Sequence, residues 1–232
     1  MPRALEKFLA APVVDSVDAA ERDRQADEVR RKACVENFAR SAGERYRGCS
    51  FKNFAARNAK QQSALDAARQ WAATFEQHWA SLVLFGPVGT GKDHLAFASV
   101  ATVAVRYGLA AVWLNGREFF GEVRDRITDQ LAERSLISRF SGPTLLVISD
   151  PLPVVGDLQS FQADMLYRVV ESRWVAKKPT IVTINVAGDA EADQRIGAAT
   201  WDRLNDGAWK IFCNWESHRK PAVRVNCQER TQ

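Results

Sequence analysis

The sequence predicts an α/β fold in which a parallel β-sheet is sandwiched by helices. Two observations lead to this prediction. Short runs that are apolar at almost every position alternate with longer segments of helical periodicity, and the first of these runs leads directly into a glycine-rich loop. Continuous apolar runs are typical of strands that are buried on both faces, as in parallel sheets. With 232 residues, of which 46% are hydrophobic, the chain is long enough for one such domain with an appendage.

Residues 1–44 are predicted to form a helical arm, because they are rich in charge and alanine and contain no strand-like run. Val29, Ala33 and Phe38 are apolar positions too widely spaced to bury a core of their own. The arm is interpreted either as a segment that docks on a partner protein or as a frayed terminal helix. Residues 45–221 hold the predicted domain and residues 222–232 a C-terminal tail.

Within the domain, helix and strand signals alternate in the order expected of an α/β sandwich. The first helix covers residues 59–79, where apolar side chains recur every three or four positions. The expected strands are residues 82–85, 110–114, 144–148, 180–184 and 209–215. The helices expected between them are residues 92–107, 116–140 and 158–177. Gly108 and Pro179 are the residues expected to end the first and the last of these three helices.

The glycine-rich loop has the spacing of a nucleoside triphosphate phosphate loop, Gly86-Pro87-Val88-Gly89-Thr90-Gly91-Lys92-Asp93. Glycines let successive backbone N–H groups turn toward phosphate oxygens, and the following helix points its positive end at them. Lys92 is expected to bridge the outer phosphates. A glycine-rich turn without function would explain neither this lysine nor its position. Nucleotide contacts are therefore predicted for the eight loop residues and His94.

Two departures from the usual phosphate-site pattern are reciprocal. The eighth loop position is Asp93, where Ser or Thr is usual, and Leu145–Asp150 carries Ser149 where the first acidic residue is usual. We expect Asp93 and Ser149 to have exchanged roles around one Mg²⁺, with Asp150 as a further ligand. Mg²⁺ accepts any such set of oxygen ligands that allows octahedral geometry.

The strand ends also offer groups for hydrolysis. Asp150 stands where a water-polarising acid is expected, although Asp is one methylene shorter than the usual Glu. Asn185 follows the strand at 180–184 and is predicted to hydrogen-bond the attacking water and the phosphate. The alternative for Asn185 is that it caps the next turn.

Single-stranded DNA is a predicted partner of the helix that begins at residue 116. Arg117, Arg124 and Arg126 alternate there with Phe119 and Phe120, and basic residues with aromatic ones can follow a single strand and stack on its bases. A helix with a solvated basic face and two phenylalanines in the core is the favoured interpretation of these residues, so the expectation of DNA contact rests mostly on the family resemblance given below. The net charge of +4 permits contact with nucleic acid without demonstrating it.

Membrane insertion and disulfide bonding are not expected. No apolar run approaches the roughly 20 residues that a transmembrane helix needs, and the N-terminus does not resemble a secretion signal. The four cysteines form no C-x-x-C pair, which indicates reduced thiols rather than a zinc site or a disulfide framework. A cytoplasmic protein is the expectation.

Taken together, these elements resemble the DnaC-type helicase loaders and the IstB-type transposition helper ATPases, both of the AAA+ class. The resemblance covers residues 45–221. It rests on the order of six segments: Tyr46–Phe54, the phosphate loop, Leu145–Asp150, Pro179–Asn185, Gly197–Arg203 and Asn214–Arg219. The last of these is similar to the W-x-S-Y-R ending of the loaders.

The resemblance implies an ATP-dependent homo-oligomer that grips single-stranded DNA and a replicative helicase or a transposase. Asn185 would be the first sensor and Arg219 the second, Arg203 the arginine that reaches a neighbouring subunit's phosphate, and Phe51 or Phe54 a neighbour of the adenine. Without the resemblance, surface ion pairing would be the expectation for both arginines. The chain departs from the family at Gly197-Ala198-Ala199, which lacks the arginine that these loaders often carry three places after that glycine, and at His218, where tyrosine is common.

Three functions follow, of which an ATP-hydrolysing helicase loader is placed first. An IstB-like transposition helper is the alternative within the family. A binding module that uses ATP as a conformational switch without turnover is the alternative of another class. A small-molecule kinase is disfavoured because the sequence shows no compact arginine-rich lid.

Overall fold

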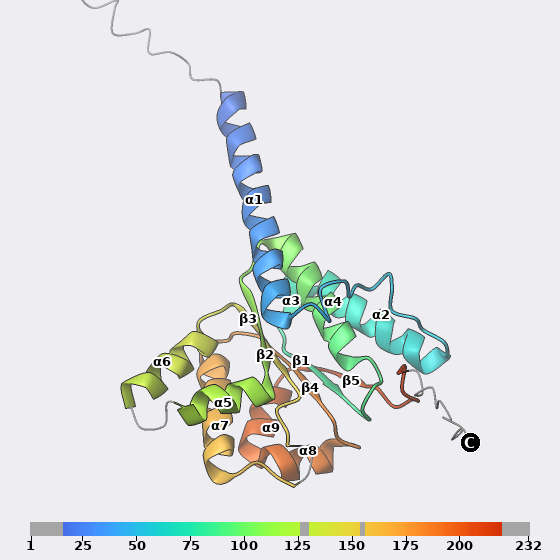
Figure 1. Cartoon of the computed structure of the whole chain (residues 1–232). Helices are drawn as coiled ribbons and strands as arrows, with labels where there is room; N and C mark the ends of the chain where they lie inside the picture. The colour runs from blue at the N-terminus through green and yellow to red at the C-terminus, as the bar shows by residue number, and fades with distance from the viewer. Residues whose placement is uncertain (1–15, 126–129, 154–155, 220–232) are drawn as a thin grey trace, which may run out of the picture.

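The computed structural model describes residues 16–125, 130–153 and 156–219, and it confirms the predicted α/β fold. Five parallel strands form one sheet in the order β2-β3-β4-β1-β5 (Figure 1). The strands are β1 (Leu82–Phe85), β2 (Ala111–Asn115), β3 (Leu145–Ser149), β4 (Thr180–Ile184) and β5 (Trp209–Phe212). The helices are α1 (Ser16–Ala42), α2 (Ala59–Ala73), α3 (Phe75–His78), α4 (Lys92–Tyr107), α5 (Gly116–Asp125), α6 (Gln130–Ser141), α7 (Ser160–Val175), α8 (Asp189–Ile196) and α9 (Ala198–Asn205).

The sheet is buried on both faces. Successive side chains of a strand point to opposite faces, so Leu82 and Leu84 join the core under α1, α2 and α4, whereas Val83 and Phe85 join the core formed with α5 to α9 (Figure 1). This double burial explains why the central strands read as continuous apolar runs in the sequence.

The register of the central strands brings their carboxyl ends together at one end of the sheet, which is called its carboxyl edge below. Phe85 pairs with Ile184, and Ser149 pairs with Thr183. The residues that follow these strands, including Asp150, therefore meet at this edge. Ligands of open parallel sheets bind outside the carboxyl ends of the strands, and the candidate site lies there.

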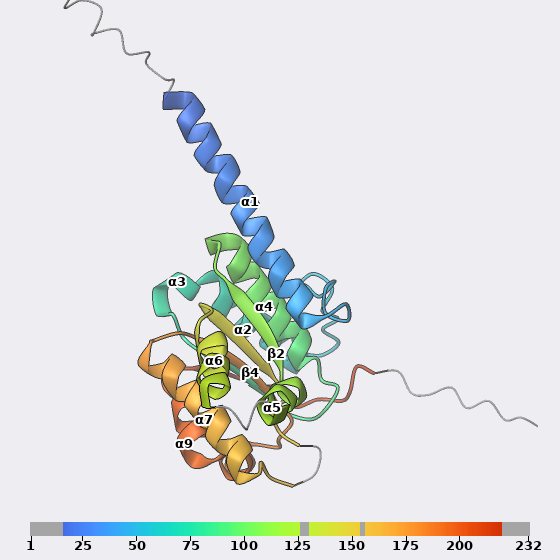
Figure 2. The same ribbon diagram turned by 60° about the vertical axis from the view of Figure 1, so that its left-hand side comes forward.

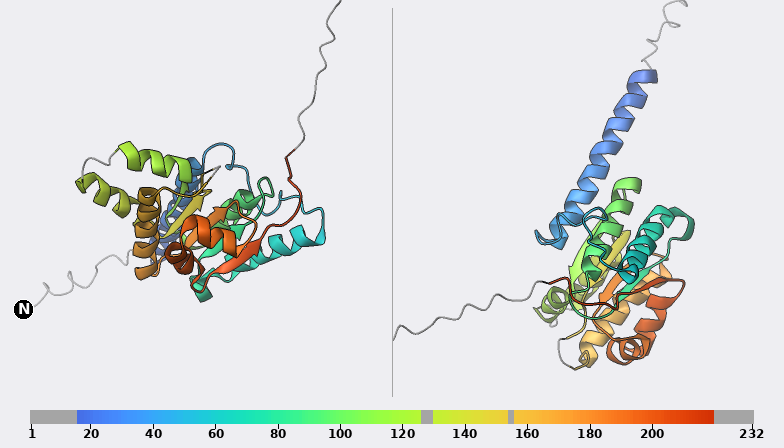
Figure 3. Two further views of the ribbon diagram at one scale, coloured as in Figure 1. Left: turned by 90° about the horizontal axis from the view of Figure 1, so that it is seen from below. Right: turned by 90° about the vertical axis from the view of Figure 1, so that its right-hand side faces the viewer.

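The last turns of α1 belong to the core, and its first half does not. Phe38 is fully buried, its ring stacks on that of Phe97 at 5.0 Å between centroids, and the Ser41 hydroxyl accepts a hydrogen bond from the backbone N–H of Trp113. Val29 is 67% exposed, and the helix extends well beyond the rest of the domain (Figures 2 and 3). None of the described helices is long and apolar enough to cross a bilayer.

The helix predicted over residues 158–177 is α7, two residues shorter at each end, and two other predicted helices differ more. The helix expected over residues 59–79 ends at Ala73, where the Thr74 hydroxyl hydrogen-bonds the carbonyl of Gln70, and α3 then ends at Trp79 in a left-handed conformation. The single helix expected over residues 116–140 is two helices, α5 and α6. The three described cysteines, Cys34, Cys49 and Cys213, are free, and Cys227 lies outside the described residues.

A buried arginine connects the elements at the opposite end of the sheet, where the strands begin. Arg173 on α7 is fully buried, and burial lowers its pKa to about 10, which leaves it charged at neutral pH. Among the described residues, its guanidinium donates to neutral oxygens: the carbonyls of Phe140, Pro143, Thr144 and Pro179 and the hydroxyl of Thr180. One side chain thereby joins α6, α7 and the starts of β3 and β4.

We predict that Arg173→Met lowers the free energy of unfolding by more than about 3 kcal/mol, because several buried oxygens lose their donor at about 1–3 kcal/mol each. Urea denaturation followed by circular dichroism measures this loss. Arg69→Met is the matched control, since Arg69 is half-exposed on α2 and its loss should cost less than about 1 kcal/mol. Equal stability of the two variants would contradict the stabilising role of the Arg173 hydrogen bonds.

Candidate nucleotide-binding site

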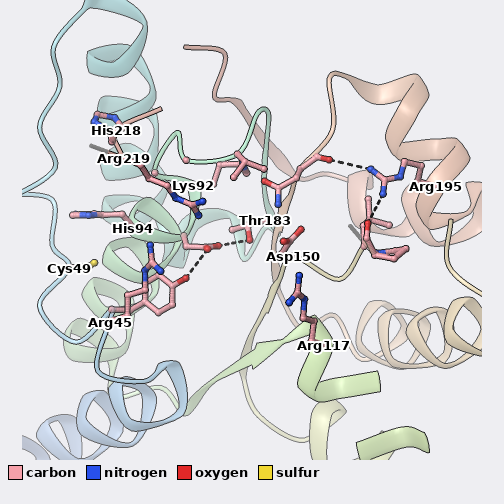
Figure 4. A pocket seen from close by; sticks show the side chains of 18 residues that line it. Arg45, Cys49, Lys92, His94, Arg117, Asp150, Thr183, Arg195, His218 and Arg219 are labelled. Atoms are coloured by element: carbon pink, nitrogen blue, oxygen red, sulfur yellow. Dashed lines mark hydrogen bonds between the residues drawn. The ribbon is translucent and has the colours of Figure 1, made fainter. Parts of the chain in front are cut away.

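A cavity of about 740 Å³ lies at the carboxyl edge of the sheet, between the loop after β1 and the ends of β3 and β4 (Figure 4). It brings together residues from distant parts of the sequence. The predicted site residues that line it are Val88, Gly89, Gly91, Lys92, Asp93, His94, Asp150, Asn185 and Arg219.

The loop after β1 has the backbone of a phosphate cradle. Gly86, Gly89 and Gly91 have φ values of 140°, 83° and 90°, a region that L side chains rarely adopt. A Cβ at Gly89 would stand 2.1 Å from the Ser217 hydroxyl oxygen, so glycine is required there for space as well. Gly91 caps α4 without a side-chain hydrogen bond, which leaves the first N–H groups of that helix available to an anion.

Lys92 is poised inside this loop. Its side chain is buried, and its Nζ donates to the carbonyls of Gly86 at 2.8 Å and Pro87 at 2.7 Å. Burial lowers the pKa of Lys92. Phosphate oxygens are stronger acceptors for an ammonium than neutral carbonyls are, so an anion in the loop can take over these contacts.

Asp93 ties the loop to two strands and to the segment before α2. Its carboxylate accepts hydrogen bonds from Thr183 at 2.6 Å, from Ser149 at 3.1 Å and from the phenol of Tyr46 at 3.0 Å. The expected neighbourhood of Asp93 and Ser149 is therefore present. Tyr46 and Thr183 were not predicted; burial and the Asp93 carboxylate raise the pKa of Tyr46.

The donor set fits Mg²⁺. Two carboxylates, Asp93 and Asp150, and the Ser149 hydroxyl offer the oxygen ligands that this ion prefers, and waters usually complete its shell. The part of the chain that the structure describes contains no cluster of three or more His, Cys, Asp or Glu side chains able to hold a metal. Of these three residues, Asp93 and Asp150 line the cavity, and the buried Ser149 hydroxyl donates to Asp93.

Asp150 is conformationally and electrostatically unusual. It has a φ of 49°, which is uncommon for a residue other than glycine and is found most often at functional positions. Burial, followed by the charge of Asp93, raises its pKa, and a hydrogen bond from the Asn185 side chain acts in the opposite direction. Asn185 therefore faces Asp150 and the cavity.

The C-terminal segment crosses over the phosphate loop. The His218 N–H donates to the carbonyl of Gly89 at 2.8 Å, and the Trp215 indole N–H donates to the carbonyl of Thr90 at 2.9 Å. These bonds bring Arg219 to the cavity wall. The tryptophan of the ending W-E-S-H-R thus anchors the segment that carries the proposed second sensor.

The phenylalanines expected near adenine do not line this cavity. Phe54 is buried beneath Gly91, with its ring 5.4 Å from the rings of both His94 and His218. Phe51 packs against the core. From the same segment, Arg45, Tyr46 and Cys49 line the cavity instead.

Arg203 lies away from the cavity, at the opposite edge of the sheet. Its Nε donates to Glu171 at 2.5 Å, and its guanidinium stacks over the ring of Trp174 at 5.3 Å. Within one chain it does not reach the phosphate loop. A role of Arg203 toward a neighbouring subunit stays a prediction.

The stacking platform expected for DNA is absent from α5. Phe119 and Phe120 are buried, at 0% and 7% exposure, because they form the apolar face of α5 against the sheet. They are core residues, as the favoured interpretation of this helix predicts, and the alternative in which they stack on bases is wrong. Arg124 is exposed, Arg117 lines the nucleotide cavity, and Arg126 lies outside the described residues.

Arg195 is a site residue that the sequence did not reveal. From α8 it donates to the carbonyls of Pro153 at 2.7 Å and Gly156 at 3.0 Å, and more weakly to that of Asn185 at 3.5 Å (Figure 4). It thereby links the segment after Asp150 to the residue after β4. Glu191 four places earlier is the local partner of Arg195, a spacing that predicts an ordinary surface pair.

A phosphate loop, a carboxylate after β3 and an amide after β4, on a sheet of order β2-β3-β4-β1-β5, define a P-loop ATPase fold of the AAA+ class. Residues 16–225 match the model of the family described as IstB-like ATP binding protein. The chain belongs to this family.

Related proteins agree with this assignment. The Replicative helicase loader DnaC of Escherichia coli (strain K12) is 30% identical over 177 residues, which cover 75% of this chain and 70% of that protein. The protein of the same name from Buchnera aphidicola subsp. Schizaphis graminum is 25% identical over 181 residues, covering 76% and 72%. The chain is thus DnaC-like in sequence.

Solved structures show the same fold. The crystal structure of the DnaC helicase loader superposes with a TM-score of 0.66 at 18% identity, covering 73% of this chain and 99% of that one. The replication initiator DnaA bound to AMPPCP and single-stranded DNA gives a TM-score of 0.59 at 15% identity, covering 73% and 50%.

The contact between Asp93 and Ser149 makes their exchange testable. Asp93→Thr removes the acceptor of three hydroxyls, and Ser149→Asp places a second carboxylate beside the first. We predict that each single change lowers ATP hydrolysis at least about tenfold, as expected for lost hydrogen bonds to a charged group, and that the double variant recovers most of the activity. A phosphate-release assay measures this. Two harmless single changes would contradict the pairing.

Proposed function

We propose that this protein is an ATP-hydrolysing helicase loader that acts in DNA replication. The observation that carries the proposal is the phosphate loop with buried Lys92, placed beside Asp150 and Asn185 at one edge of the sheet. The similarity to proteins named Replicative helicase loader DnaC over three quarters of the chain supports a replicative helicase as the partner. Single-stranded DNA is proposed as a second partner.

In this proposal different residues of the chain bind the phosphates, hold Mg²⁺ and activate the water. The loop amides and Lys92 bind the phosphates, and Asp93, Ser149 and Asp150 hold Mg²⁺, which supplies positive charge to the terminal phosphate. Asp150 accepts a proton from the attacking water, and its raised pKa favours proton acceptance. Asn185 orients that water, and Arg219 binds phosphate from the C-terminal side.

Oligomerisation is proposed from the position of Arg203. Because this arginine lies at the opposite edge of the sheet from the phosphate loop, it can meet a nucleotide only in another copy. Its ion pair with Glu171 holds the guanidinium in place in the single chain. A homo-oligomer that forms on ATP or DNA would bring Arg203 of one copy to the site of the next.

Two alternative functions are each supported by a specific observation. The family description IstB-like ATP binding protein favours a transposition helper, with a transposase as partner. The short carboxylate of Asp150, at a position where Glu is usual, favours an ATP-dependent switch with little turnover. Nucleotide binding without phosphate release would identify the second alternative.

The direct test is ATP turnover of wild type and Lys92→Ala, with and without single-stranded DNA. Lys92→Ala removes the ammonium that compensates phosphate charge, so we expect at least about tenfold weaker ATP binding and loss of turnover. Lys177→Ala at the opposite edge of the sheet is the matched control and should behave as wild type. Turnover that persists in Lys92→Ala would contradict the proposed site.

The arm provides a test of partner binding. Deletion of residues 1–28 removes the projecting part of α1 and keeps Phe38 in the core, so folding and ATP binding should be retained. We expect the truncated protein to lose its complex with the replicative helicase, measured by size-exclusion chromatography. Full helicase binding by the truncated protein would contradict the role of the arm.

A further inference from the structure

We propose that Arg117 contacts the terminal phosphate of the nucleotide bound by its own chain. This inference rests on the proposed function. Arg117 is the second residue of α5 and lines the cavity that Lys92 and Asp150 also line. Figure 4 shows its guanidinium directed toward Asp150.

The fold delivers Arg117 to this place through a close backbone contact. β2 lies beside β3, with Asn115 paired to Ser149, and the Asn115 side chain accepts the N–H of Arg117 at 3.0 Å, which turns the chain into α5. A Cβ at Gly116 would stand 2.3 Å from the Cα of Pro151. Glycine at this position therefore lets α5 begin directly against the residue that follows Asp150.

The guanidinium of Arg117 is available to an anion. No described residue forms a hydrogen bond or an ion pair with it, whereas Arg195 is engaged with backbone carbonyls and Arg203 with Glu171. Its charge acts on Asp150, since it lowers the pKa of that carboxyl against the effect of burial. Arg117 is thus a cation next to the carboxylate whose guanidinium has no hydrogen-bond partner among the described residues.

The position of Arg117 differs from that of the other cavity arginines. Arg45 and Arg219 line the cavity on the side of the phosphate loop and α4, and Arg117 lies beside Asp150, at the ends of β3 and β4 (Figure 4). A terminal phosphate that is bound by Lys92 and faces Asp150 and Asn185 would have Arg117 on the side away from Lys92. Cations on both sides of the group neutralise more of its charge than one does.

Arg117 would supply from within the chain a cation that Arg203 cannot supply, because Arg203 does not line the cavity of its own chain. During hydrolysis the water oxygen bonds to the terminal phosphorus, the bond from that phosphorus to the ADP oxygen breaks, and the water proton passes to Asp150. Arg117 would stabilise the charge on the phosphoryl oxygens throughout.

Equilibrium binding of ATPγS and of ADP, each with Mg²⁺, tests the contact. Arg117→Gln should bind ATPγS at least about tenfold more weakly than wild type, because it loses a charged hydrogen bond, with ADP affinity unchanged. Arg139→Gln on α6, outside the cavity, is the matched control and should bind both nucleotides as wild type does. Unchanged ATPγS affinity, or equal losses for the two nucleotides, would overturn the proposal.

A mixing experiment separates action within a chain from action between chains. Arg117→Gln should lose turnover by roughly 10²–10³-fold, as expected when one charge-stabilising donor is removed. Excess Lys92→Ala chains, which carry Arg117 without a working loop, should not restore this turnover. Restoration would place Arg117 in a neighbour's site and overturn the inference. Failure of wild type to bind either nucleotide would instead overturn the proposed function itself, and wild type that binds without turnover leaves the ATPγS comparison decisive.

Discussion

The carboxylate of Asp93 is the interaction on which the site depends. It stands in the first turn of α4 and accepts three hydroxyl hydrogen bonds, from β3, from β4 and from Tyr46 in the segment before α2. A charged acceptor makes stronger hydrogen bonds than a neutral one, so these contacts hold the phosphate loop against the strand ends. Binding of Mg²⁺ to Asp93 would therefore change the hydrogen bonds that join it to both strands and to the segment that leads into α2.

Other contacts extend this connection beyond the cavity. The C-terminal segment is bonded to the loop through Trp215 and His218, and Arg195 joins the residues after β3 to the end of β4. Changes of charge at the phosphates can thus reach α8 and the C-terminal segment through hydrogen bonds. The arm is coupled differently, since Phe38 stacks on Phe97 of α4, the helix that begins at Lys92.

Much of the fold could be predicted because it follows from local rules. The elements β1, α4 and β4 have the bounds that the sequence predicts. The apolar run at residues 82–85 is β1, the glycine after Tyr107 marks the end of α4, and the proline before Thr180 precedes β4. The loop motif also fixes where the nucleotide site lies. The contact of Asp93 with Ser149 was predictable because two unusual residues compensate each other, whereas Tyr46 and Thr183 depend on tertiary packing and carry no such signal. The burial of Phe119 and Phe120 agrees with the favoured interpretation of α5, in which both are core residues.

The most direct test of the account is a crystal structure of the protein with Mg²⁺ and a non-hydrolysable ATP analogue. The account predicts one nucleotide per chain, with the Lys92 ammonium moved from the carbonyls of Gly86 and Pro87 to the outer phosphates and the Asp93 carboxylate at the metal. A nucleotide bound elsewhere, or a Lys92 that keeps its carbonyl contacts beside bound nucleotide, would contradict it.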